Sequence, residues 1–146
     1  MTKTSPDGLT PVMDALVQVS FAVVDLLSRS AAELDLSVTQ LRLIGILRDR
    51  SPSMAALADH LGLDRSSVSG LIDRAERRGL VSRRSSEDDA RVTLIDLAPA
   101  GRQIGERLGA RVSERIEQML ENVQPAERAG FVRMADSLLG TAANRG

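Results

Sequence analysis

The sequence predicts a mainly α-helical protein with a small β-hairpin, organised as a winged helix-turn-helix with long helices before and after it. Three observations predict this class. Two short amphipathic segments are joined by "GLD", residues 62–64, which is the tight glycine-containing connection of a helix-turn-helix. After them the hydrophobic period changes from helical to strand-like over about 20 residues. Longer segments of helical period flank this central region.

Length and composition limit the class further. A chain of 146 residues fits a single domain with a real core. Apolar residues make up 42% and aromatic residues 1%, so the core must be aliphatic. The net charge of −1 argues against a protein that coats nucleic acid indiscriminately, although it allows one basic face.

The chain also lacks the residues of several other chemistries. It contains no cysteine, which removes disulfides, thiol redox sensing and thiolate metal ligands. The N-terminal segment has no apolar core of signal-peptide type, and no run approaches about 18 consecutive apolar residues. We therefore expect a soluble cytoplasmic protein, associated with the nucleoid when it binds DNA.

The helices of the middle region carry recognisable start and stop signals. Ser37, followed three residues later by a glutamine, has the spacing of a capping box. Ser53 caps a short helix that Gly62 ends, and Asp64 caps a second one that Gly79 ends. The second helix is predicted from residue 65 to about residue 78.

After this helix, "LVSRR" and "RVTLIDL" are rich in β-branched residues and flank the polar loop "SSEDDA", which predicts a hairpin whose second strand opens at Arg91. The first flanking helix begins at Thr10–Pro11, the second runs from Pro99 to Asn122, and the third begins at Gln124–Pro125. Their broad apolar faces predict a dimer. We divide the single domain, 1–146, into a winged region, 37–98, and a helical dimerisation region, 9–36 and 99–141.

Positive charge is concentrated in "LDRSSVSGLIDRAERRGLVSRR", residues 63–84, where six arginines stand against three carboxylates. At 100° per residue, the second short helix turns its apolar residues to one side and small or basic residues to the other. Small hydroxyl residues allow close approach to base edges in a major groove, and arginines reach phosphates or guanine. A solvated polar face is the alternative interpretation.

The hairpin adds a second basic element. Arg83 and Arg84 lie at the end of its first strand, and Arg91 follows Asp89 at its loop. A basic hairpin suits a backbone clamp or a minor-groove probe, whereas an ordinary surface ion pair contributes little. The candidate DNA-contacting residues are Ser53, Arg65, Ser66, Ser67, Ser69, Gly70, Arg74, Arg77, Arg83, Arg84, Asp89 and Arg91.

Three stretches together resemble the MarR family of bacterial transcription regulators: "SVTQLRLIGIL", "SMAALADHLGLDRSSVSGLIDRAERRGLVSRR" and "DDARVTLIDLAPAGR". The resemblance implies a homodimer that binds a pseudo-palindromic operator and represses nearby genes. It implies recognition helices in major grooves, Arg91 at the wing tip in the minor groove, and Asp89 as its orienting partner. The chain departs from the family pattern at Ala90, where arginine is frequent, and at Gly70, where a larger and often basic residue is common.

The resemblance also implies release of DNA by a small anionic aromatic ligand. Candidate ligand-binding residues are Phe21, Asp25, Arg29, Arg42 and Met119, although a core role for Phe21 and a surface role for Arg42 are the simpler interpretation. We expect no cofactor and no metal, since the one histidine, His60, cannot form a multi-ligand site by itself. The sequence contains no catalytic constellation. The alternative function is a winged-helix interaction module that contacts an acidic protein partner.

Overall fold

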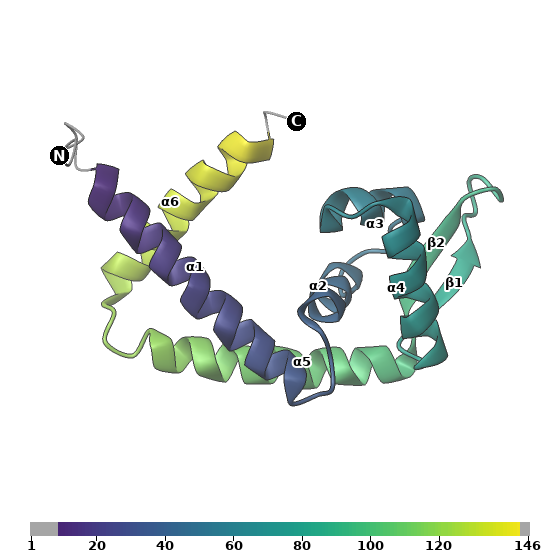
Figure 1. Cartoon of the computed structure of the whole chain (residues 1–146), viewed down its shortest axis with the longest axis horizontal. Helices are drawn as coiled ribbons and strands as arrows, with labels where there is room; N and C mark the ends of the chain where they lie inside the picture. The colour runs from purple at the N-terminus through teal and green to yellow at the C-terminus, as the bar shows by residue number, and fades with distance from the viewer. Residues whose placement is uncertain (1–8, 144–146) are drawn as a thin grey trace. The chain divides into compact units, whose positions relative to one another are not determined.

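The computed structural model describes residues 9–143. Its elements follow the order α1 (Leu9–Ala32), α2 (Val38–Leu47), α3 (Met54–Leu61), α4 (Arg65–Arg77), β1 (Val81–Ser85), β2 (Thr93–Leu97), α5 (Pro99–Met119) and α6 (Pro125–Ala143) (Figure 1). The chain forms two units, 1–112 and 113–146, so that the division falls within α5. Each unit is described by itself.

The core of the first unit lies between α2, α3, α4 and the hairpin. Its most deeply buried large side chains are Leu43, Leu57, Val68, Ile72 and Ile95. All are aliphatic, as the composition predicts. Ala31 near the end of α1, Leu34 in the turn after it and Leu108 from α5 join the same cluster. The winged region is thus held by residues from both of its flanking helices.

Three of the predicted capping residues, Ser37, Ser53 and Asp64, begin helices as expected. The Gln40 amide donates to Ser37 Oγ at 3.1 Å, and the Ser37 amide donates back to Gln40 Oε1 at 3.0 Å, which completes the capping box. Ser53 accepts from the Ala56 amide at 3.2 Å. Gly62 and Gly79 follow α3 and α4 with φ of +65° and +69°, a left-handed conformation that favours glycine.

The two strands pair antiparallel, with Val81 opposite Leu97 and Arg83 opposite Ile95. The loop before α3 adds a further connection, because the Ile95 amide donates to the Pro52 carbonyl at 3.0 Å and Ser53 forms a bridge with Leu94. The hairpin is therefore attached to the helix-turn-helix at its base and not only through the chain.

Four boundaries differ from the sequence prediction. Arg91 does not open the second strand, because β2 begins at Thr93 and Arg91 lies in the turn. A hydrogen bond from the Val92 amide to the Asp89 carbonyl, 2.9 Å, closes that turn. The first strand is Val81–Ser85, one residue later than predicted. Thr10 is inside α1 rather than before it, and α5 ends at Met119, three residues early.

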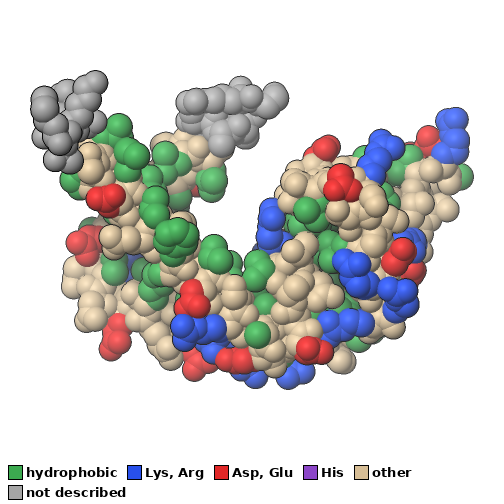
Figure 2. Space-filling view, in the orientation of Figure 1, with side chains coloured by type: hydrophobic (Ala, Val, Ile, Leu, Met, Phe, Trp, Pro, Cys, Tyr) green, Lys and Arg blue, Asp and Glu red, His purple; other side chains and the backbone are tan. Residues whose placement is uncertain are grey.

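Much of α1 is not covered within the first unit. Its exposed large apolar residues are Leu9, Val12, Met13, Leu16, Val17, Val19, Phe21 and Val24. Figure 2 shows hydrophobic side chains following this helix. By length and composition α1 could also cross a membrane, a test that core helices of soluble proteins and signal sequences also pass. In the second unit α6 likewise exposes Phe131, Val132, Met134, Leu138 and Leu139.

Candidate nucleic-acid interface

Helix α4 has one buried side and one open side. Val68, Leu71, Ile72 and Ala75 are at most 3% exposed and fix the helix to the core. The open side carries the residues predicted from the helical period, all exposed except the half-buried Gly70: Ser66, Ser67, Ser69, Gly70, Arg74 and Arg77. Figure 2 shows arginine side chains over α4 and the hairpin, with carboxylates among them.

Ser67 is committed to the start of the helix. Its amide donates to Asp64 Oδ1 at 2.8 Å and its hydroxyl donates to Asp64 Oδ2 at 2.7 Å. These two hydrogen bonds hold the pKa of the Asp64 carboxyl below its usual value. The Ser67 oxygen can still accept a hydrogen bond, whereas Ser66 and Ser69 retain their hydroxyl donors, since no partner for them is found among residues 9–143.

The six arginines of residues 63–84 fall into two groups. The side chains of Arg65, Arg74 and Arg77 form no hydrogen bond or ion pair with any residue in the described part of the chain. The others are bound internally. Arg78 donates to the Asp35 carbonyl at 2.8 Å, Arg84 to Asp96 Oδ2 at 2.6 Å, and Arg83 to two carboxylates of α4.

The Arg84 contact is part of a small network at the base of the hairpin. The Ser51 hydroxyl, from the loop before α3, donates to the other oxygen of Asp96. This hydrogen bond, and secondarily the one from Arg84, lowers the pKa of the Asp96 carboxyl. Arg84 thus belongs to the network that joins the hairpin to the loop before α3.

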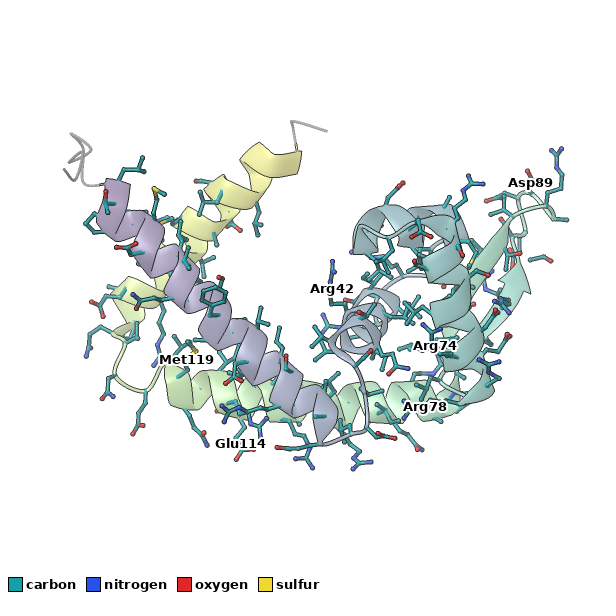
Figure 3. The ribbon with its side chains drawn as sticks, in the orientation of Figure 1. Arg42, Arg74, Arg78, Asp89, Glu114 and Met119 are labelled. Carbon is teal, nitrogen blue, oxygen red and sulfur yellow. The ribbon has the colours of Figure 1, made fainter. Side chains whose placement is uncertain are left out.

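Arg91 is at the outer end of the hairpin, next to Asp89, which Figure 3 labels at the tip. Its Nε donates to Asp89 Oδ1 at 3.2 Å and its amide donates to the same oxygen at 3.0 Å. The side chain of Arg91 is 91% exposed. Asp89 therefore binds both the amide and the Nε of Arg91, while the side chain remains almost fully exposed to solvent.

Gly70 and Arg74 are adjacent on the open side of α4. A Cβ added at Gly70 would lie 3.2 Å from Arg74 Nη1, so the guanidinium lies over the glycine. The missing side chain therefore leaves room for the arginine one turn later.

Two hollows lie beside these residues. One, of about 350 Å³, is lined by Ser53 at the start of α3, by Arg65 at the start of α4 and by Arg91 of the hairpin. The other, of about 670 Å³, lies between the start of α2 and the open side of α4, where Ser66, Gly70 and Arg74 line it. The structure thus brings Ser53, Arg65 and Arg91 together although they come from three elements.

The five candidate ligand-binding residues lie in different surroundings. Phe21 is 69% exposed on α1, and Asp25 and Arg29 form an ion pair with each other at 2.8 Å. The guanidinium of Arg42 donates to the carbonyls of His60 and Leu61, both at 3.3 Å. Met119 belongs to the second unit.

Sequence reasoning missed the acidic residues that bind the arginines: Asp35, through its backbone carbonyl, and the carboxylates of Asp73, Glu76 and Asp96. A partial signal existed for Asp73 and Glu76, because their separation of three residues puts both on one side of a helix. The pairing of Asp96 with Ser51 joins residues 45 positions apart, and no local pattern indicates it.

This fold and this surface define a winged helix-turn-helix protein. Residues 34–92 match the family model described as "MarR family". The chain is 29% identical over 91 residues to the transcriptional repressor YetL of Bacillus subtilis, a match that covers 62% of this chain and 54% of that protein. It matches 46–61% of the length of its curated relatives. Residues 34–92 are therefore similar to the MarR family, and the curated relatives that the chain matches are described as HTH-type transcriptional regulators.

Solved structures extend the similarity to the whole fold. The structure of RV1404 from Mycobacterium tuberculosis has a TM-score of 0.77 at 26% identity, and the match covers 95% of this chain and 97% of that one. A mutant of MarR from E. coli, complexed with operator DNA, has a TM-score of 0.74 at 20% identity, with 93% and 99% covered. The predicted fold class is confirmed.

Proposed function

We propose that the protein is a homodimeric transcriptional repressor that binds a pseudo-palindromic DNA operator through α4 and the hairpin loop. The observation that carries the proposal is the open side of α4. It combines small hydroxyl residues with Arg74 and Arg77, whose positive charges have no ion-pair partner within residues 9–143. The E. coli relative complexed with operator DNA and the relative described as a repressor support the same function.

In this proposal α4 enters the major groove. Ser66 and Ser69 contact base edges, and the absence of a side chain at Gly70 lets Arg74 lie close to the helix and reach a base or phosphate. Ser53 and Arg65, which line the hollow of about 350 Å³, bind the sugar–phosphate backbone of the DNA. Arg91 enters the adjacent minor groove, oriented by Asp89.

The dimer is proposed from the exposed apolar side chains. Monomeric soluble proteins rarely expose long apolar faces, and α1 carries eight exposed large hydrophobic residues. A second copy that covers them around a two-fold axis would place two α4 helices about one turn of DNA apart. A dimer at micromolar concentration by light scattering is expected. A monomer would contradict the proposal, and a monomer that co-sediments with lipid vesicles would indicate that α1 binds membrane instead.

We include in the proposal the release of DNA by a small anionic aromatic compound, with Phe21, Asp25, Arg29, Arg42 and Met119 as candidate contacts. Arg42 would have to leave the carbonyls that it binds in this structure. Thermal-shift screening of benzoate-type acids, followed by DNA binding in their presence, tests this part. A compound that raises the melting temperature and lowers DNA affinity is the expected result; a panel without such a compound contradicts it.

DNA binding is tested by selecting duplexes from a random pool with the purified protein and titrating the selected duplex at several salt concentrations. Affinity should fall steeply with salt, because bound phosphates release counterions. Arg91→Ala should weaken binding about tenfold at unchanged thermal stability. Arg48→Ala is the matched control, since that exposed arginine pairs with Asp49 and lies beside α5. A wild-type protein that selects no duplex and binds an acidic protein would support the interaction-module function instead.

A further inference from the structure

Arg83 connects the hairpin to α4 through two carboxylates. Its Nη2 donates to Asp73 Oδ1 at 2.6 Å and its Nη1 donates to Glu76 Oε2 at 2.5 Å. The two acidic residues are three positions apart on α4, so one guanidinium reaches both. We call these three residues the clamp.

The position of Arg83 on β1 explains why its side chain reaches α4. Val81 and Arg83 are two residues apart, so their side chains point to the same face of β1. Their partners across the hairpin are Leu97 and Ile95. Val81, Leu97 and Ile95 are buried, so this face of the hairpin is turned toward the core. The stem of Arg83 thus lies at the core edge, its side chain is only 33% exposed, and its charged end meets α4.

Both sides of the clamp reinforce the charged state of the other. The hydrogen bond from Arg83 is the main reason that the pKa of the Asp73 carboxyl is lowered, and the bond to Asp73 in turn raises the pKa of Arg83. Arg83 and Asp73 therefore remain ionised at neutral pH. Its geometry uses a nitrogen on each arm of the guanidinium fork, a strong arrangement for arginine and carboxylates.

We propose that Arg83 is a positioning residue, which with Asp73 and Glu76 holds the hairpin at a fixed angle to the recognition helix, and that it is not a phosphate contact. The inference rests on the proposed DNA-binding function. It reassigns Arg83 from the set of DNA-contacting residues that the sequence suggested. To contact a phosphate, Arg83 would have to leave two hydrogen bonds and expose two unpaired carboxylates beside the DNA.

The two roles predict opposite effects when the carboxylates are removed. If Arg83 contacts a phosphate, the double variant Asp73→Ala, Glu76→Ala frees it and removes two negative charges, so DNA binding becomes tighter. If the clamp positions the hairpin, the same variant loosens it and binding becomes weaker, by about fivefold to tenfold. Alanine is well tolerated at exposed helix positions, so α4 itself is retained.

The experiment measures the affinity of three variants for the selected duplex. They are the clamp double variant, Arg83→Gln, and the triple variant that combines all three substitutions. The clamp predicts that each change weakens binding and that the triple variant is no weaker than Arg83→Gln, because the residues act as one unit. The matched control is Glu87→Ala, Asp88→Ala. It removes two exposed loop carboxylates that have no ion pair within residues 9–143, and should tighten binding slightly.

A second readout follows the hairpin directly. Amide hydrogen exchange in β1 and β2 should be faster in Arg83→Gln and in the clamp double variant than in the control, without DNA. Tighter binding by the double variant, or unchanged exchange in the hairpin, would overturn the inference. A wild-type protein that binds no duplex would instead contradict the proposed function, so the two failures are distinguishable.

Discussion

Replacing Gly101 with alanine would place a methyl group against the backbone that joins α4 to the hairpin. Gly101 is the third residue of α5 and is buried. A Cβ at this position would lie 1.9 Å from the Leu80 carbonyl oxygen and 2.9 Å from its carbonyl carbon. An ordinary contact begins near 3.4 Å, so the two segments would have to separate by about 1.5 Å. The same Leu80 oxygen accepts the hydrogen bond from the Ala98 amide at 3.0 Å.

The magnitude follows from three contributions. Forcing an extra methyl group into a packed contact destabilises by about 1–3 kcal/mol. Weakening the hydrogen bond to the Leu80 carbonyl adds about 1 kcal/mol. The better helix propensity of alanine offsets about 1 kcal/mol of this. The free energy of unfolding should therefore fall by about 1–3 kcal/mol, which corresponds to a decrease of roughly 4–10 °C in melting temperature for a chain of this size.

Calorimetry or thermal unfolding by circular dichroism measures the change, and α5 supplies its own control. Gly109 is exposed on the same helix and an added Cβ meets nothing within 4 Å. Gly109→Ala should therefore raise the melting temperature by a few degrees, because only the propensity effect remains. If Gly101→Ala were as stable as the wild type, the close approach of α5 to Leu80 would be wrong.

Two further predictions concern Asp96 and Asp35. The pKa of Asp96 is lowered in the folded protein, so its ionised form contributes stability above the unfolded value of about 3.9 and loses it as the pH falls through the folded value. Asp96→Asn should be less stable than the wild type at pH 7, with a gap that closes below about pH 4 in thermal unfolding; a constant gap would refute the ionic contribution. Asp35 has φ of +57°, and Arg78 binds its carbonyl. Asp35→Gly should match or exceed the wild-type stability, whereas Asp35→Val should lose about 1–2 kcal/mol; equal stability of the two variants in urea unfolding would contradict the left-handed assignment.

The sequence was informative where structure depends on neighbouring residues. Capping at Ser37, Ser53 and Asp64, and the left-handed glycines after α3 and α4, follow from spacings of a few positions. The buried side of α4 follows equally well from its helical period. These features are local, so one sequence is sufficient to predict them.

The partners of the arginines could not be predicted in the same way. Arg83 and Arg84 are adjacent and chemically identical, yet they bind carboxylates on different elements because successive strand residues point to opposite faces. Arg91 was assigned to a strand because its neighbours are β-branched, but the hydrogen bonds of Asp89 hold it in a turn. Charge density along the sequence does not separate paired from unpaired arginines, because pairing depends on residues distant in sequence.

The central claim is that the open side of α4 and the hairpin loop form the DNA-binding surface. Amide hydrogen exchange of the wild-type protein, with and without its selected duplex, tests this claim most directly. Protection on DNA addition is expected in residues 64–77 and in the loop around Arg91, with the exposed part of α1 unaffected by DNA. Protection confined to other segments, with α4 and the hairpin unchanged, would contradict the account.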